Sequence, residues 1–393
     1  MSVVARTLCA VAAVALLAAP SATASSSVVQ QLALLERAGV HVPRVVKPVQ
    51  RRALTVDEPA LAETYQPGIA WEWQWADSRI GEVPDWVLRA AASVKIAVID
   101  SGADVNAPDL ADKTPRTWSV LSRSTRVPDR LGHGTFVASL ATGSVSNGTG
   151  VSGFGGDAQL LVVQAIDADG YITDVDEAAA IVYAVKHGAK IVNLSIGGSE
   201  TSQVEQCAIR WAARRGVLIV AAAGNEHDEG NLPEYPAALL QPLGSHGRGG
   251  IGLAVGATSM DGTRSYFSNT GSYLSLAAPG YNVFAAESAD APWPRAQLPW
   301  SSPGYYGWAS GTSFSSPEVA GVAALVWAAN PRLTARQVAK VLKQSATGTT
   351  WNRELGWGRL DAAAAVRLAL VTEGAALRHV RHDPRPIHSS PPS

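Results

Sequence analysis

An alternation of short apolar runs with helical patterns, spread over residues 94–370, limits the folds open to this chain more than any other feature. Runs that are apolar at consecutive positions are typical of strands buried on both faces, and helices between such strands are typical of parallel sheets. The pattern therefore predicts a doubly wound α/β fold, with a mostly parallel sheet and helices on both faces. The predicted strands span 94–99, 160–163, 191–194, 217–222 and 251–255, and the predicted helices span 175–187, 204–214, 317–329, 334–344 and 361–370.

The charge balance limits the partners of such a fold. The chain of 393 residues carries 32 Lys and Arg against 33 Asp and Glu, a formal net charge of -1. It therefore has no basic excess that would attract nucleic acid or an anionic membrane surface. We expect no nucleic-acid partner, and we expect ligands at the carboxyl ends of the strands, where open parallel sheets bind them.

The two ends of the chain differ from the part between them. Arg6 precedes an apolar run and then Ala22-Thr23-Ala24, which together are typical of a secretory signal peptide. A membrane anchor is the alternative, but the run is short for a membrane span. We expect a secreted, extracellular, monomeric protein without a stable membrane anchor. The predicted segments are a signal peptide at 1–24, a short pro-segment at 25–60, the folded domain at 61–372 and a disordered tail at 373–393.

Cysteine chemistry is not expected to stabilise the mature chain. The sequence has two cysteines, and Cys9 lies within the predicted signal peptide. Cys207 is then left without a partner for a disulfide bond. Its place in a helical pattern predicts a buried thiol that takes no part in chemistry.

Polar residues suited to acyl transfer stand where strands end or helices begin. They are Asp100, His133, Asn225 and Ser313. Taken singly, each has an ordinary interpretation as a helix cap, a packed histidine or a turn residue. Taken together, they supply a nucleophile, a base within the right pKa range and a carboxylate to orient that base. An amide side chain and a backbone N–H at a helix N-terminus can hold the oxyanion.

The motifs around these residues resemble those of the subtilisin-like serine peptidases. AVIDSGAD contains Asp100, GHGTFVA contains His133, AAAGN ends at Asn225 and SGTSFSSP contains Ser313. The Asp, His, Ser order and the asparagine donor are the standard description of subtilisin chemistry. Further matches are VNLSIGG, AVGA and AAPG, and the likeness covers about residues 61–372.

This resemblance implies a serine endopeptidase that hydrolyses proteins or peptides through an acyl-enzyme and requires no cofactor for its chemistry. Ser313 is then the nucleophile and His133 its general base. Asp100 orients His133, and Asn225 donates to the oxyanion.

The same resemblance suggests where substrate is bound. The segment of Ser195, Ile196 and Gly197 is expected to pair with the substrate backbone as an added strand. Glu226 and Glu234 lie near the expected pocket for the residue before the scissile bond, where acids would favour Lys or Arg. A solvated polar loop is the alternative interpretation of the two acids.

A structural calcium ion is also implied by the family. Asp109 in APDL and Asn147 in VSNGTGVSG match positions that hold calcium in many family members. Oxygen ligands from a side chain and a glycine-containing loop suit this cation. An ordinary turn is the alternative interpretation of Asn147.

The sequence departs from the family pattern at a few places. Glu318 and Ala107 stand where the family usually has histidine, at positions not expected to do chemistry. Residues 291–309 are longer and more aromatic than expected, and we expect them to shape or cover the cleft. The pro-segment is shorter than the folding chaperone domain typical of the family.

Other functions fit the sequence less well. A catalytically silent binding protein on the same scaffold is the main alternative, but all the reacting positions are filled. An α/β-hydrolase needs a G-x-S-x-G elbow, and Ser315 stands where that motif needs its second glycine. A zinc peptidase needs H-E-x-x-H, which does not occur in the sequence.

Overall fold

The central element of the fold is a seven-stranded sheet in the order β4-β5-β3-β6-β7-β8-β9. The computed structural model describes residues 59–374, so the predicted signal peptide, most of the predicted pro-segment and nearly all of the predicted tail lie outside it. All neighbouring strands pair in parallel, which confirms the predicted doubly wound α/β fold. The strands are β3 (Lys95–Asp100), β4 (Arg116–Ser119), β5 (Gln159–Gln164), β6 (Ile191–Leu194), β7 (Leu218–Ala222), β8 (Gly252–Thr258) and β9 (Leu276–Pro279).

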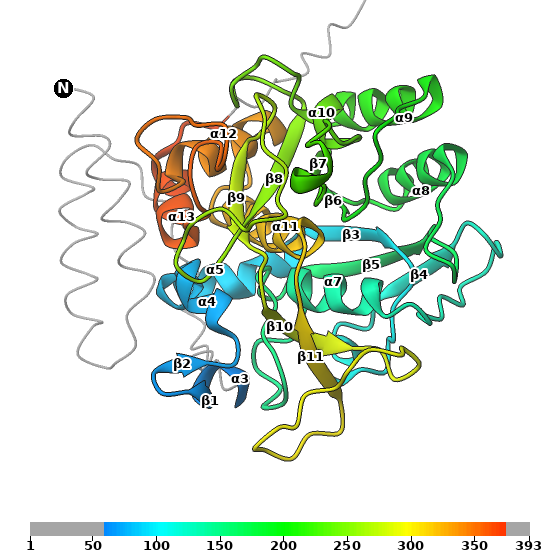
Figure 1. Cartoon of the computed structure of the whole chain (residues 1–393), viewed down its shortest axis with the longest axis vertical. Helices are drawn as coiled ribbons and strands as arrows, with labels where there is room; N and C mark the ends of the chain where they lie inside the picture. The colour runs from blue at the N-terminus through cyan, green and yellow to red at the C-terminus, as the bar shows by residue number, and fades with distance from the viewer. Residues whose placement is uncertain (1–58, 375–393) are drawn as a thin grey trace, which may run out of the picture.

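Helices cover both faces of this sheet (Figure 1). Within β3, Ile96 and Val98 pack into the core on one face, whereas Ala97 and Ile99 pack into the core on the other. Because successive strand side chains point to opposite faces, burial of both faces requires the continuous apolar runs seen in the sequence. One face carries α8 (Asp174–Lys186), α9 (Gln203–Arg214) and α10 (Ala237–Leu240), and the other carries α5 (Asp85–Ala90), α7 (His133–Thr142), α11 (Thr312–Ala329), α12 (Ala335–Ser345) and α13 (Ala362–Val371).

Helix α11 begins five residues before its predicted start at Pro317. Pro317 lies inside the helix and has no N–H to donate to the Ser313 carbonyl oxygen. The hydroxyl of Ser195 donates to that oxygen instead, at 2.6 Å. Ser195, which directly follows β6, therefore supplies the hydrogen bond that Pro317 cannot make, and the helix continues past the proline.

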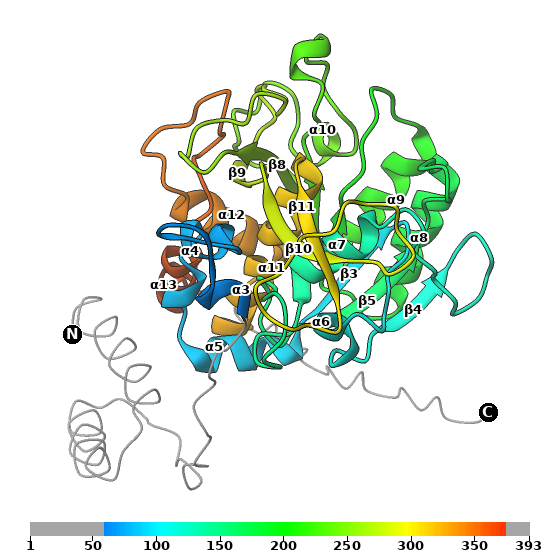
Figure 2. The ribbon, with the colours of Figure 1, turned by 60° about the horizontal axis from the view of Figure 1, so that its bottom comes forward.

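Smaller elements surround the layers. A hairpin of β10 (Val283–Glu287) and β11 (Tyr305–Ala309) packs against α7; it extends below the sheet in Figure 1 and lies at the front of the molecule in Figure 2. The aromatic run 291–309 forms most of the loop between these two strands and the whole of β11. The remaining elements are α3 (Pro59–Ala62), β1 (Thr64–Gln66), β2 (Ile69–Ala70), α4 (Trp73–Asp77), α6 (Pro108–Ala111) and the short 3-10 helices η1 (Ile80–Glu82), η2 (Ala91–Ser93) and η3 (His227–Glu229).

Cys207 is exposed, so the prediction of a buried thiol was wrong. Helix α9 buries a single stripe that includes Ala208, Ile209 and Ala212, and Cys207 falls outside this stripe.

Among residues 59–374, no helix combines the length and apolar character needed to cross a membrane.

Candidate active site

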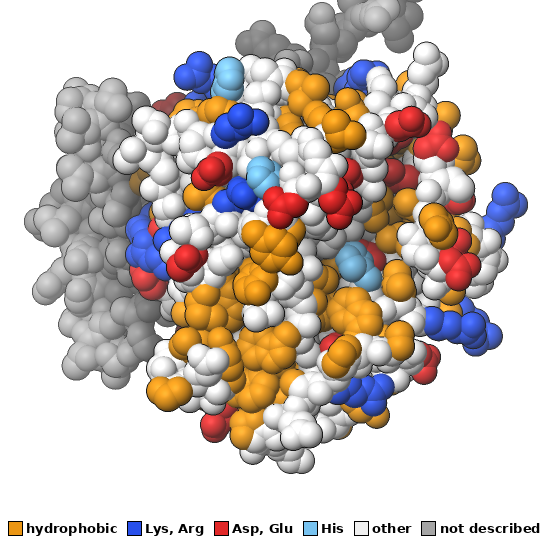
Figure 3. All heavy atoms as spheres, viewed as in Figure 1, with side chains coloured by type: hydrophobic (Ala, Val, Ile, Leu, Met, Phe, Trp, Pro, Cys, Tyr) orange, Lys and Arg blue, Asp and Glu red, His pale blue; other side chains and the backbone are white. Residues whose placement is uncertain are grey.

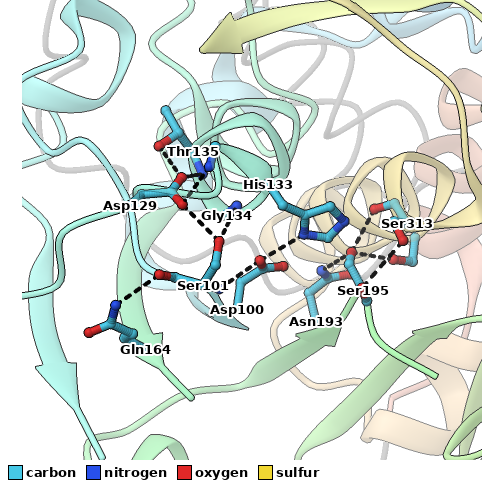
Figure 4. A network of polar contacts seen from close by, with 12 residues as sticks. Asp100, Ser101, Asp129, His133, Gly134, Thr135, Gln164, Asn193, Ser195 and Ser313 are labelled. Carbon is cyan, nitrogen blue, oxygen red and sulfur yellow. Dashed lines mark hydrogen bonds and ion pairs between the residues drawn. The ribbon is translucent and has the colours of Figure 1, made fainter. Parts of the chain in front are cut away.

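The residues predicted to be catalytic meet where β3 ends and where two helices begin. Asp100 is the last residue of β3, His133 is the first residue of α7, and Ser313 is the second residue of α11. Figure 4 shows the His133 imidazole between the Asp100 carboxylate and the Ser313 side chain. The fold thus brings these separated side chains into one site.

Asp100 holds His133 by one short hydrogen bond. Nδ1 of His133 lies 2.7 Å from Oδ1 of Asp100, and the N–H of Ser101 donates to the same oxygen at 2.7 Å. The Asp100 side chain is fully buried, and its Oδ2 has no hydrogen-bond partner among the described residues. A carboxylate that accepts from Nδ1–H fixes the tautomer in which Nε2 is free to take a proton.

The pKa of His133 is raised above its ordinary value. Burial lowers the pKa, but the charge of Asp100, the hydrogen bond to Asp100 and the charge of Asp129 together outweigh burial. The imidazolium form is therefore stabilised beside Ser313, where proton transfer from the serine would create it.

The Ser313 hydroxyl donates to the carbonyl oxygen of Ser195 at 3.3 Å. Among the described residues, no hydrogen bond joins Ser313 Oγ to His133. Nucleophile-to-base hydrogen bonds of this kind often form only when substrate is bound. Proton transfer to His133 thus requires the hydroxyl to exchange the Ser195 oxygen for Nε2.

The amide of Asn225 is held in one orientation by Thr312, the first residue of α11. Its Oδ1 accepts from the Thr312 N–H at 2.8 Å and from the Thr312 hydroxyl at 3.0 Å. Because Oδ1 is used in this way, Nδ2 remains as a donor. The Ser313 N–H lies in the first turn of α11, where backbone N–H groups have no helical partner. Both groups suit an oxyanion.

A buried carboxylate outside the predicted set fixes the start of α7. Oδ1 of Asp129 accepts from Gly132 N–H at 2.8 Å, and Oδ2 accepts from the Thr135 N–H at 2.7 Å and hydroxyl at 2.6 Å. Asp129 therefore satisfies backbone donors of the first turn of the helix that carries His133. The sequence signal for this contact is an Asp four positions before His133 and a Thr two positions after it.

Asp129 also ties this helix to β3 (Figure 4). The hydroxyl of Ser101, next to Asp100, donates to Asp129 Oδ1 at 2.8 Å and accepts from the Gly134 N–H at 2.9 Å. A Cβ atom at Gly134 would collide with the Gly102 carbonyl oxygen, so the close approach of the two segments requires glycine. The network fixes His133 relative to Asp100.

The start of the aromatic run 291–309, which was expected to shape or cover the cleft, lies against this part of the site. Trp293 packs on Phe314 with ring centroids 6.4 Å apart, and Phe314 packs on His133 at 5.5 Å. A Cβ atom at Gly132, which has a φ of 86°, would clash with Ala291. Ala291 and Trp293 therefore form a wall of the site next to His133, whereas Trp300, Tyr306 and Trp308 pack in a separate cluster around Phe284.

The expected substrate segment follows β6 and leaves its backbone partly unpaired. Ser195 is buried and its hydroxyl is bound to α11, so its side chain does not face a substrate. Ile196 and Gly197 make no backbone hydrogen bonds to other described residues, whereas Gly198 pairs with Tyr235 at 3.0 and 2.8 Å. Unpaired N–H and C=O groups of this kind can accept an added strand.

Glu234 is buried between two backbone segments of the site. A Cβ atom placed on Gly197 would lie 2.5 Å from Glu234 Oε2, and one placed on Gly224 would clash with the Glu234 side chain. Burial raises the pKa of Glu234 to about 7, and the charge and hydrogen bond of Glu226 add to this effect. Glu234 is therefore a buried residue and does not belong to a solvated loop, the alternative interpretation of this acid.

Asp109 and Asn147 lie in neighbouring segments, but protein donors occupy Asp109. Its Oδ1 accepts from the Val151 N–H at 3.0 Å, and its Oδ2 accepts from the Tyr306 hydroxyl at 2.8 Å. Asn147 Oδ1 accepts from the Thr149 N–H at 3.0 Å, as in an ordinary turn. Each Asp109 oxygen therefore already accepts one hydrogen bond from the protein, and a calcium ion would have to share these oxygens with their donors. Calcium binding stays a prediction.

Comparison with known proteins gives the same family as the motifs. The model of the subtilase family matches residues 91–358. Thermitase from Thermoactinomyces vulgaris is 33% identical over 299 residues, which cover 75% of this chain and 96% of thermitase. Subtilisin E from Bacillus subtilis (strain 168) is 30% identical over 361 residues, which cover 88% of each chain.

A solved structure has a similar fold. The crystal structure of a cold adapted subtilisin-like serine proteinase superposes with a TM-score of 0.56 at 26% sequence identity, covering 70% of this chain and 90% of that chain. The likeness in fold and the likeness in sequence therefore agree.

Proposed function

Because this chain belongs to the subtilase family and is a serine-type endopeptidase, we propose that it cleaves peptide bonds with a triad of Asp100, His133 and Ser313. The main support is the 2.7 Å contact between His133 Nδ1 and Asp100 Oδ1. The opposite side of the imidazole ring points toward Ser313 (Figure 4). Proteins or peptides are the substrates, as for any member of this family of proteases.

The first step is attack by Ser313 Oγ on the carbonyl carbon of the scissile bond. His133 Nε2 takes the hydroxyl proton, and Asp100 stabilises the imidazolium that results. The carbonyl oxygen becomes negative and accepts from Asn225 Nδ2 and from the Ser313 N–H. These donors gain strength from their position at the N-terminus of α11.

The second half regenerates the enzyme. His133 gives its proton to the leaving nitrogen, the C–N bond breaks, and an ester between Ser313 and the carbonyl carbon remains. Water then attacks this acyl-enzyme with His133 again as the base. The proton returns to Ser313 Oγ when the acid product leaves.

Substrate main chain is proposed to lie along Ile196 and Gly197, whose backbone groups support pairing with an added strand. Glu234 and Glu226 are proposed to favour a basic side chain before the scissile bond. The buried position of Glu234 against Gly197, within the backbone segment that would hold the substrate, supports this preference.

Export and maturation belong to the same proposal. We propose that residues 1–24 direct secretion and are removed, and that residues 25–60 are a pro-segment. The N-terminal sequence and mass of the protein recovered outside the producing cell test both cleavage points. A melting temperature that rises with added calcium would support the predicted ion at Asp109 and Asn147, because a ligand of the folded state stabilises it.

Covalent labelling tests the catalytic assignment. A fluorophosphonate should label Ser313 in the mature protein, and Ser313→Ala should abolish both labelling and peptide hydrolysis while the melting temperature is kept. Ser301→Ala, which changes an exposed serine, is the matched control and should label as the wild type does. A folded wild-type protein that neither labels nor hydrolyses peptides would instead support the silent binding protein.

A further inference from the structure

The loop that follows β10 is fastened to the surroundings of the catalytic histidine. The Ser288 hydroxyl donates to the backbone carbonyl oxygen of Asp129 at 2.7 Å, and the Ala289 N–H donates to the Asp104 carboxylate at 3.1 Å. Asp129 is also the residue whose side chain fixes the first turn of α7, which begins at His133. The start of the loop is therefore bound to the same segment that positions the general base.

The same loop is closed on itself and on β11. Arg295 donates from Nη2 to the carbonyl oxygen of Ala289 at 2.8 Å, and its guanidinium lies over the Tyr305 ring at 3.6 Å from the ring centroid. These contacts join the end of the segment 288–295 to its beginning and to the returning strand. Trp293 is thus carried by a segment that is held at both ends.

Trp293 packs against both helices that carry the proposed reacting groups. Its ring lies 5.7 Å from Phe136 of α7 and 6.4 Å from Phe314 of α11, measured between ring centroids. Phe136 and Phe314 also pack on each other at 4.7 Å. These separations are those of packed aromatic pairs. The three rings therefore join the helix that begins at His133 to the helix that carries Ser313.

This packing affects the separation of the nucleophile from the base. Phe314 directly follows Ser313, and its ring centroid lies 5.5 Å from that of the His133 imidazole. Among the described residues, no hydrogen bond joins Ser313 Oγ to His133, so the separation of these two groups depends on where the two helices begin. A displacement of about 1 Å between reacting groups can lower a rate about 100-fold.

We propose that Trp293 is a positioning residue, which holds the starts of α7 and α11 at the separation that proton transfer from Ser313 to His133 needs. The Asp129 network fixes His133 relative to Asp100, whereas Trp293 fixes it relative to Ser313. Trp293 acts through the two phenylalanine rings and needs no contact with the substrate. The proposal rests on the proposed function, because that function makes Ser313 and His133 the reacting pair.

Two substitutions at Trp293 test this inference. Trp293→Ala should lower kcat about 10- to 100-fold with little change in KM, and Trp293→Phe, which keeps a ring, should recover most of the loss. The rate constant for fluorophosphonate labelling of Ser313 should fall by a similar factor, because labelling needs the same proton transfer. A fluorophosphonate has no peptide on its leaving side, so a parallel loss of both rates cannot come from a lost contact with the leaving half of a substrate.

Trp300→Ala is the matched control. Trp300 belongs to the same β10–β11 loop but packs on Trp71 at 5.5 Å and on Phe284 at 6.5 Å, in the cluster separate from His133. Figure 3 shows hydrophobic side chains gathered over the part of the surface where Figure 1 places β10 and β11. Trp300→Ala should lower the melting temperature, measured in Ser313→Ala protein, but keep the wild-type kcat and labelling rate constant.

Two results overturn the inference. Wild-type kcat in Trp293→Ala would show that the separation does not depend on Trp293, and slower peptide hydrolysis with an unchanged labelling rate would show that Trp293 instead contacts the substrate. If Trp293→Ala does not fold, Ser288→Ala removes only the hydroxyl that fastens the loop to Asp129. It should lower both rates together by a smaller factor, and unchanged rates would again overturn the inference. A folded wild-type protein that does not label at Ser313 is a failure of the proposed function.

Discussion

The N–H of Thr312 donates to Oδ1 of Asn225 at 2.8 Å, and this bond decides which end of the amide is left to face a substrate. If Nδ2 then holds the oxyanion, Asn225→Ala should lower kcat about 100- to 1,000-fold with little change in KM. Steady-state hydrolysis of a peptide measures both constants. Asn106→Ala, at an exposed asparagine, should leave them unchanged. A loss confined to KM would contradict the oxyanion assignment.

The raised pKa of His133 predicts the acid limb of the pH profile. In the proposed mechanism attack by Ser313 needs neutral His133, so kcat/KM should rise with pH through the raised pKa of this histidine, above the ordinary value of roughly 6.5. Removing the charge of Asp129 removes one cause of the elevation. Asp129→Asn should therefore move the acid limb to lower pH.

The same variant should also lower kcat and the free energy of unfolding, the latter by about 1–3 kcal/mol, because an amide cannot accept all the hydrogen bonds that Asp129 accepts. The pH profile separates the two effects. A lower kcat with an unmoved acid limb would mean that Asp129 is only structural.

Burial of Glu234 predicts a preference for Lys or Arg before the scissile bond that strengthens with pH. The pKa of Glu234 is raised to about 7 by burial and by Glu226, so its carboxylate form should gain population as the pH rises through that value. The ratio of kcat/KM for lysine over alanine peptides should increase over this range, and Glu234→Gln should reduce it. Glu229→Gln, on the exposed η3, should keep the wild-type ratio. A ratio that does not respond to Glu234→Gln would contradict the assignment.

The sequence predicted the sheet because strands buried on both faces need consecutive apolar residues, and such runs occur in β3, β5, β6, β7 and β8. It could not predict that α11 starts at Thr312, because the hydroxyl that replaces the missing N–H of Pro317 belongs to Ser195. The β10–β11 hairpin was not predicted either, since it packs on α7 and lies outside the alternating pattern.

The candidate site divides in the same way. Asp100, His133, Asn225 and Ser313 stand in local motifs, so the sequence could predict them once these motifs were taken together. Asp129 acts through contacts with Ser101 and Thr135 that depend on tertiary structure. Glu177 and Glu205 come from two helices and become neighbours only when α8 packs beside α9, so the sequence could not predict the acidic cavity that they line.

Glu318 predicts a measurable loss of stability at neutral pH. It lies inside α11 with no exposed surface, and neither carboxylate oxygen has a hydrogen-bond partner among the described residues. Burial raises its pKa well above the usual range, and the charges of Asp77 and Glu72 add to this effect. In the unfolded chain the same group ionises near its ordinary pKa of roughly 4.3.

Between these two pKa values the folded protein holds a proton that the unfolded chain has lost, so the free energy of unfolding falls as pH rises above roughly 4.3. Glu318→Met removes both the proton linkage and the unpaired oxygens, and it should raise the free energy of unfolding at pH 7 by about 1–3 kcal/mol. Denaturant unfolding of Ser313→Ala protein, which cannot digest itself, measures this change at several pH values. Glu354→Met, at an exposed position, should leave the free energy of unfolding unchanged at each pH. A stability gain that is equally large at pH 4 and pH 7 would show that proton linkage at Glu318 is not its cause.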